Sequence, residues 1–518
     1  AEKAINGIDI SELVDGTIRL QLTLTDSSNN IGSVVESTTT KDAQPEITSI
    51  RISGQVTFDR VPHNMNGIGL DYDSISELPI REISLRIRDA SNDTIATTKT
   101  DANGDYQVTV PANIEVRVEV LAELFEADPG LNWLTRVVDD SSGNALYVLQ
   151  GSLADTGEAD QIRNLHAGSG WDGTDYTAER AAAPFAILDS LYQIYDRIRS
   201  ESVSLSMPEL EVRWSGGNAD GSFYRSGGGA DYIEIGGAAN LDTDEYDQHV
   251  IVHEWLHYYE DQVSRGDTIG GSHSLSDHLE PRTAYSEGRG NAWSGIILDD
   301  PIYKDALGAG QELGFDLNLE SETGFVSGWY SERSVQEIIY DLVDSDNEGV
   351  DTLNLSVADL IDVWQSSDYV NQNSLTTLYS FREVLEDFYP PSATAITALM
   401  QNEDILGTGL YGAGETNDGG QTYGLPVYHD LSVGAVPFEI CSDRDEGEYN
   451  RLGNRQLLRF SINTEGSYLV EMDRHAGSTN YDAAVETDPD FVIYLQDSAV
   501  TNYDAGEGSS SDVDSEIL

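Results

Sequence analysis

Apolar and polar residues alternate along the first 155 residues of the chain. The segment 17–25 alternates strictly, and the segments 50–58 and 83–88 show a similar pattern rich in Ile, Val and Leu. Because successive side chains of a strand point to opposite faces, this period of two predicts strands that bury one face. We therefore expect the N-terminal part of the chain to consist of β-structure.

The period changes after a loop rich in Gly and Asp that ends near residue 173. In the segment 182–198, apolar residues recur at i, i+3, i+4 and i+7, which predicts a core helix. Short strands are expected at 211–214 and 231–235, and more helices follow through residue 399. Strand patterns return after residue 430. The pattern therefore predicts an α+β region between two β regions.

The chain is extremely acidic. It carries 92 acidic and 28 basic side chains, which gives a formal net charge of −64 and a pI of about 4.1. Such a charge repels phosphates, which argues against binding of nucleic acid or an anionic membrane. Two explanations remain: a halophilic surface whose self-repulsion is screened by salt, and carboxylate clusters that bind Ca2+. We favour adaptation to salt or seawater, with some bound Ca2+ in addition.

A single cysteine, Cys441, excludes an intramolecular disulfide, so stability must come from core packing and bound metal. No run of 18 apolar residues occurs, so no insertion into a membrane is expected. The chain begins at Ala1 with neither a methionine nor a signal peptide, which predicts a processed protein or a fragment. Its length of 518 residues predicts three or four domains.

The most specific chemical signal is the motif H-E-W-L-H at 253–257. His253 and His257 are four residues apart, so on a helix they lie on one face and can bind the same metal ion. Glu254 follows the first histidine, where a carboxylate can reach a metal-bound water and act as general base. The alternative is a surface helix with two solvated histidines, although a chance match arises in only about 1 per cent of such chains.

A third ligand is expected downstream, because catalytic zinc takes three protein ligands and keeps one position open. The segment 283–295 supplies Glu287 as the candidate. Asn291 lies one helical turn further along the same face, where its side chain could hold a zinc-bound histidine by a hydrogen bond. An ordinary exposed glutamate is the alternative for Glu287.

The two motifs together, H-E-W-L-H and S-E-G-x-x-N about thirty residues later, resemble the gluzincin class of zinc metallopeptidases. The resemblance implies a zinc ion held by His253, His257 and Glu287, with Glu254 as the base that activates a zinc-bound water. Thermolysin-like enzymes usually have an aspartate where this chain has Asn291. The surrounding motifs, among them D-T-I-G-G-S-H-S and L-G-N-R-Q-L-L-R-F, resemble a group of secreted bacterial peptidases.

The flanking regions resemble β modules of secreted proteins. Residues 1–46 resemble part of an immunoglobulin-like repeat, residues 47–155 the carboxypeptidase regulatory-like sandwich, and residues 430–518 a truncated C-terminal sandwich of the prepeptidase type. We therefore expect a multidomain protein in which an α+β zincin-like catalytic domain at 156–429 is flanked by all-β sandwich domains. Further repeats lost from the ends could attach it to a cell surface.

The residues that would surround the metal are less specific. Gluzincins often stabilise the oxyanion with a downstream Tyr or His, and Tyr330 or Tyr340 could serve, with an aromatic core role as the alternative. His273 and His278, in the loop between the two motifs, could each face the cleft, but we expect them to be ordinary polar loop residues. By analogy with zincins, the strand at 232–235 is expected to edge the cleft and pair with an extended substrate.

A calcium loop is a further candidate at 344–349, where oxygen-bearing side chains alternate and a glycine comes sixth. Its ligands would be Asp344, Asp346 and Glu348. The bidentate glutamate expected at the twelfth position of such a loop is missing, so an ordinary acidic turn is the alternative.

These observations predict a secreted or cell-surface bacterial protein that is a zinc-dependent metalloendopeptidase with protein or peptide substrates. The expected cofactors are Zn2+ and, in the acidic loop, Ca2+. Two alternatives remain. One is a zinc hydrolase that acts on non-peptide substrates or trims only chain ends. The other is a non-enzymatic acidic cell-surface adhesin with a vestigial zinc unit, which the flanking β modules and the acidity favour.

Overall fold

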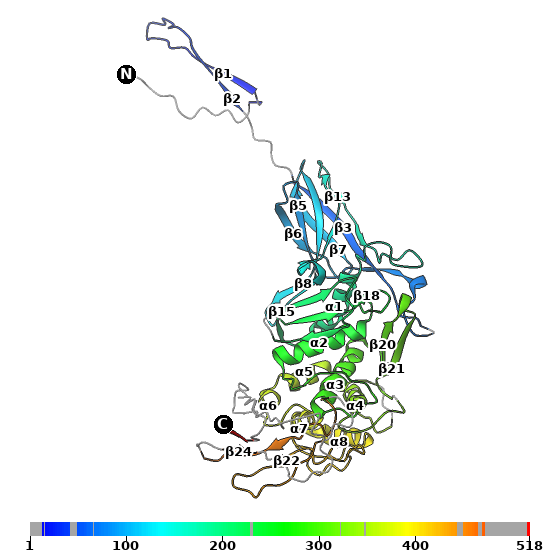
Figure 1. Ribbon diagram of the computed structural model, residues 1–518. Coiled ribbons are helices and arrows are strands. Elements are labelled where there is room, and N and C mark those ends of the chain that lie inside the picture. The colour runs from blue at the N-terminus through cyan, green and yellow to red at the C-terminus, as the bar shows by residue number, and fades with distance from the viewer. Residues whose placement is uncertain are drawn as a thin grey trace.

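The fold is a mixed α/β arrangement of several sheets and eight described helices, with β-structure first and helices after it (Figure 1). The predicted strands at 17–25, 50–58 and 83–88 are confirmed in large part as β1 (Gly16–Leu22), β3 (Ser49–Arg60) and β5 (Ile83–Asp89). The computed structural model describes residues 13–14, 16–41, 49–65, 67–227, 231–321, 323–345, 349–442, 449–464, 469–471 and 515–517.

The N-terminal region contains three sheets. β1 pairs with β2 (Val35–Lys41) as a separate hairpin. β3 is the centre of a five-stranded sheet with β4 (Ser76–Pro79), β7 (Asp105–Pro111), β13 (Gln161–Ile162) and β14 (Leu165–Ala167). A ten-stranded sheet contains β5 and, besides it, β6 (Thr94–Lys99), β8 (Glu115–Asp128), β9 (Leu131–Asp139), β10 (Ala145–Leu146), β11 (Val148–Gln150), β12 (Ala154–Asp155), β15 (Leu205–Trp214), β16 (Phe223–Arg225) and β17 (Tyr232–Ile235).

The ten-stranded sheet joins segments on both sides of residue 155. β15 runs parallel to β9, with Val212 opposite Val137, and β17 runs parallel to β15. β16 then pairs with β17 in the antiparallel sense and forms the edge. The expectation that the strand at 232–235 edges the cleft is therefore wrong, because β16 pairs with the outer side of this strand and is itself the edge strand. The division of the chain into four domains stays a prediction, and this sheet is continuous across one of the predicted boundaries.

The helices pack on one another and on the sheets. The helix predicted at 182–198 is confirmed as α1, which lies against β8 and β9. α2 packs between the strands β15 to β17 and α3, and α3 packs on α4. The helices are α1 (Ala183–Ser200), α2 (Gln248–Val263), α3 (Pro281–Leu298), α4 (Glu332–Asp341), α5 (Val357–Gln365), α6 (Ser367–Val370), α7 (Leu378–Phe388) and α8 (Ala393–Asn402).

A four-stranded sheet flanks α2 and α3, and it consists of β18 (Gly237–Ala238), β19 (Asp242–Thr243), β20 (Ile302–Leu307) and β21 (Leu313–Asn318). The described C-terminal strands are β22 (His429–Asp430), β23 (Leu458–Arg459), β24 (Leu469–Glu471) and β25 (Ser515–Ile517). Most of the predicted C-terminal sandwich lies outside the described residues. Within the described part of the chain, no helix combines the length and the hydropathy needed to cross a membrane.

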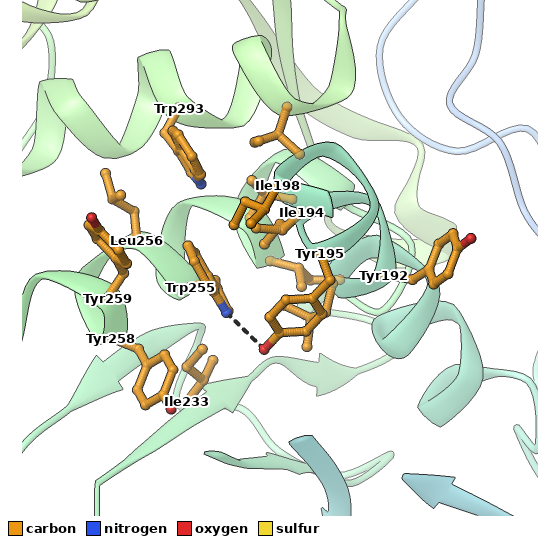
Figure 2. Close-up of a cluster of buried hydrophobic side chains, with 14 of the residues drawn as sticks. Tyr192, Ile194, Tyr195, Ile198, Ile233, Trp255, Leu256, Tyr258, Tyr259 and Trp293 are labelled. Atoms are coloured by element: carbon orange, nitrogen blue, oxygen red, sulfur yellow. Dashed lines mark hydrogen bonds between the residues drawn. The ribbon is translucent and has the colours of Figure 1, made fainter. Parts of the chain in front are cut away.

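An aromatic core packs on the face of α2 that carries Trp255 (Figure 2). The helical period places His253 and His257 on the opposite face. Trp255 is fully buried, and its Nε1 donates to the Tyr195 hydroxyl of α1 at 3.2 Å. The indole also stacks on Trp293 of α3, with ring centroids 6.1 Å apart. Large aromatic side chains packed in this way resist displacement, since truncating one costs about 3–5 kcal/mol. The rotation of α2 about its own axis is therefore set by its apolar face.

Candidate metal centre

The structure brings His253, His257 and Glu287 together between α2 and α3. The Nε2 atoms of the two histidines lie 3.0 Å apart, and each is 3.2 Å from Glu287 Oε2. The side chains of His253 and Glu287 are buried, and that of His257 is largely so. The spacing in the sequence predicted this convergence, because His253 and His257 share one helical face. That these atoms bind a metal ion stays a prediction.

Two glycines let α3 come close to its neighbours. A Cβ atom added to Gly290 would lie 2.7–2.9 Å from three atoms of the His253 ring. A Cβ atom added to Gly288 would lie 2.5 Å from the carbonyl oxygen of Glu332 and from Val335 Cβ. Atoms do not pack at such separations, so α3 reaches both α2 and α4 only because these positions lack a side chain.

The second ring nitrogen of each histidine faces an oxygen atom. His253 Nδ1 is 2.9 Å from Asn291 Oδ1, and His257 Nδ1 is 3.3 Å from Glu260 Oε2. An amide oxygen and a carboxylate only accept hydrogen bonds, so these contacts favour the tautomer with the proton on each Nδ1, in which each Nε2 presents a lone pair to an ion shared with Glu287. Asn291 thus lies where the sequence placed it. Glu260 was missed, although it stands one turn after His257.

His273 and Glu332 complete the polar surroundings of His253, His257 and Glu287. The sequence offered His273 only as the less favoured alternative of a residue facing the cleft, and it gave no indication of Glu332. His273 Nδ1 is 2.9 Å from Glu332 Oε2, and His273 Nε2 is 3.3 Å from Glu287 Oε2. The other oxygen of Glu332 accepts from Asn291 Nδ2 at 2.8 Å. Burial lowers the pKa of His273, but the charges of Glu332 and Glu287 outweigh it and raise the pKa to about 10.

The prediction of His273 as an ordinary loop residue is therefore wrong. Its position in the chain, between the two motifs, was the only signal that could have pointed to it. The sequence contained no signal for Glu332. An acidic residue in the first turn of α4 is already explained by its favourable interaction with the helix dipole.

Glu254 lies beside the edge strand of the ten-stranded sheet. It is largely buried, and its Oε2 accepts a hydrogen bond of 2.7 Å from the backbone N–H of Tyr224, the middle residue of β16. Since Glu254 accepts from an N–H that points away from β17, its carboxylate lies at the outer edge of β16. The H-E-W-L-H motif predicts the place of Glu254 on α2, whereas only the fold shows that a strand edge runs past it.

Tyr330 and Tyr340 are both buried. The Tyr330 hydroxyl is 2.8 Å from Asn417 Oδ1 and 2.9 Å from the carbonyl oxygen of Ser327. Its single proton is engaged by these acceptors and is not available to a substrate. These contacts speak against the catalytic role predicted for Tyr330, and they favour the core role that was its alternative.

The predicted calcium loop is described only in part. Asp344 follows α4 and is partly buried. Asp346 and Glu348 lie outside the described residues. Calcium binding by this loop therefore stays a prediction.

Replacing Gly290 with Ala should weaken zinc binding, because the added methyl group must displace the His253 ring that Asn291 holds. We expect a loss of about 10-fold or more in zinc affinity, the size of effect seen when the support of a ligand is disturbed. Competition with a chromogenic chelator measures it. Gly217→Ala is the control, since a Cβ atom there meets nothing within 4 Å. Equal zinc affinity in the two variants would contradict the prediction.

Comparison with known proteins found similarity over the middle of the chain. The family described as the Mycolysin C-terminal domain matches residues 199–390, a segment that contains His253, His257 and Glu287. No curated protein matches the chain. Among solved structures, the precursor of protealysin, a metalloproteinase from Serratia proteamaculans, is similar with 9% sequence identity and a TM-score of 0.31, over 52% of this chain and 87% of that one.

Proposed function

We propose that the protein is a zinc-dependent endopeptidase in which His253, His257 and Glu287 bind the ion. The observation that carries this proposal is the convergence of two Nε2 atoms and one Oε2 atom at separations of 3.0–3.2 Å. Tetrahedral zinc with bonds of about 2.0–2.1 Å places its ligand atoms roughly 3.3 Å apart, so this donor set fits the ion. The match of residues 199–390 to the Mycolysin C-terminal domain supports the assignment.

The residues around the ion would divide the chemistry among them. Bound zinc would polarise the scissile carbonyl and make water more acidic. The Glu254 carboxylate accepts a proton from the attacking water and passes it to the leaving amine. The Tyr224 N–H holds Glu254 Oε2, which fixes the orientation of the base. Asn291 and Glu260 keep the two histidine rings turned toward Glu287.

We assign to His273 the role of oxyanion donor for which Tyr330 was the first candidate. His273 touches Glu287 but is not one of the three mutually close ligands. Its side chain is 31% exposed, against 7% for His253 and 13% for His257, so a substrate can reach it. Glu332 holds Nδ1, and Nε2–H, which contacts Glu287 Oε2 at 3.3 Å, would turn from that oxygen to the carbonyl oxygen of the substrate as negative charge develops there.

The free edge of β16 favours an extended peptide as the substrate. An edge strand presents backbone groups that can pair with an added strand. Because Glu254 accepts from the backbone N–H of Tyr224, a peptide that lies along this edge and pairs with its other backbone groups would pass the base and extend beyond it in both directions. This arrangement favours cleavage of internal bonds over removal of chain ends, and a peptide over a non-peptide substrate.

Hydrolysis of a long peptide blocked at its N-terminus tests the function. We expect cleavage at internal bonds, loss of activity after removal of zinc by a chelator, and its return when zinc is added. Measurements in high salt suit the acidic surface. Cleavage of only the unblocked form would make the protein an exopeptidase. No cleavage of either form, with one zinc bound per chain, would contradict the proposal.

The variant Glu254→Gln isolates the base. The amide cannot accept the proton, so kcat should fall by about 10²–10⁴-fold. Zinc content should stay at one per chain, because Glu254 is not a ligand in this assignment. Elemental analysis and steady-state kinetics of the same preparation measure both quantities. Unchanged turnover would remove Glu254 from the mechanism.

The variant His273→Ala isolates the donor. We expect kcat to fall by about 10²–10³-fold, with KM and zinc content little changed, since the lost hydrogen bond forms only as the oxyanion develops. His278→Ala, in the same loop, is the matched control and should leave kcat unchanged, because its ring packs on Tyr330. Loss of zinc in His273→Ala would instead identify His273 as part of the metal site.

A further inference from the structure

A second group of acidic side chains lies at the start of α2, apart from the candidate zinc ligands. Asp242 is in β19, Asp244 follows that strand, and Asp305 is in β20. One carboxylate oxygen from each lies within 4.8 Å of those of the other two. We call these three residues the acidic cluster.

One carboxylate oxygen of each residue in the acidic cluster is buried without a hydrogen-bond partner. Asp244 is only 2% exposed. Its Oδ2 accepts from the Ser222 hydroxyl, but its Oδ1 is buried without a hydrogen bond. The Oδ1 atoms of Asp242 and Asp305 are likewise buried and unbonded. A buried carboxylate oxygen with no donor is costly, so three of them in one place require a compensating charge.

No basic side chain of the described residues supplies that charge, since none forms an ion pair with Asp242, Asp244 or Asp305. Asp247, the first residue before α2, adds a further negative charge, and its own neighbour is His63, whose Nε2 lies 3.0 Å from Asp247 Oδ1. Burial, followed by the charges of Asp247 and Asp242, raises the pKa of Asp305 to about 8. The cluster must therefore bind either protons or a cation.

We infer that the acidic cluster binds a calcium ion. All of its donors are carboxylate oxygens, which suit hard cations and not zinc, and no histidine or cysteine belongs to the group. Calcium accepts several carboxylates in a flexible geometry, whereas magnesium needs a near-ideal octahedron and usually keeps waters. The site is separate from the loop at 344–349.

The bound ion would connect three elements. Asp242 belongs to β19, Asp305 to β20, and Asp244 lies three residues before Asp247, the N-terminal cap of α2. Asp247 Oδ2 already accepts from the backbone N–H of Ala306 in β20 at 2.9 Å. Calcium would therefore stabilise the start of the helix that carries His253, without contacting the zinc ligands. The inference does not depend on the proposed peptidase activity.

Calorimetry on the full chain tests the calcium site. All metals are removed with a chelator, one equivalent of zinc is restored, and calcium is then titrated. We expect a calcium-binding event in the wild type that is absent in Asp244→Asn and in Asp305→Asn, with magnesium binding more weakly. Asp316→Asn is the control, because it removes the same charge from an exposed position on the β20–β21 hairpin. It should keep the event.

Thermal unfolding gives a second measurement that survives a poorly behaved variant. Calcium at about 100 times its Kd should raise the Tm of the wild type by about 5–10 °C and leave that of Asp305→Asn nearly unchanged. Without calcium, Asp305→Asn should melt at or above the wild-type temperature, since a repelling charge is gone. The inference is overturned if the wild type neither binds calcium nor gains stability. It is also overturned if both cluster variants keep the binding event, or if Asp316→Asn loses it.

Discussion

The close approach of α2 and α3 is the constraint on which the rest of the structure depends. Two imidazoles on one helix and a carboxylate on the other meet only if the helix surfaces touch with no side chain between them. Gly290 provides this by placing bare backbone against the His253 ring. On its opposite face α2 is fixed by Trp255, which packs between α1 and α3. The packing of the apolar face of α2 therefore determines the direction in which its polar face, with the two histidines, points.

Polar groups buried at this contact are arranged so that donors meet acceptors. A continuous chain of contacts leads from His253 to Asn291, then to Glu332, to His273 and to Glu287, which itself contacts His253. The contacts bring together α2, α3, α4 and the loop between the two motifs. Buried networks of this kind hold their members in one geometry, because breaking any contact leaves an unpaired group away from water. Such rigidity is what a metal site needs from its surroundings.

The acidity of the chain has two different physical expressions. Among the described residues, most acidic side chains are at least partly exposed, so water and salt can screen their charge. At Asp244 the same charge is buried, where screening is weak and a specific counter-charge is required. Composition reports the sum of the two and cannot separate them. The sequence pointed to the loop at 344–349 because oxygens alternate there, whereas Asp305 meets Asp244 only through the pairing of β20 with its neighbours.

By itself the sequence determined what depends on local periodicity. The strands at 50–58 and 83–88, the helix at 182–198 and the shared face of His253 and His257 all follow from repeats of two or 3.6 residues. The tertiary structure alone decided which distant elements meet. It placed His273 and Glu332 beside Glu287, put Tyr330 in the core, made β16 the sheet edge and gathered the acidic cluster. Contacts between residues some sixty positions apart, such as His273 with Glu332, arise from packing and leave no periodic trace in the chain.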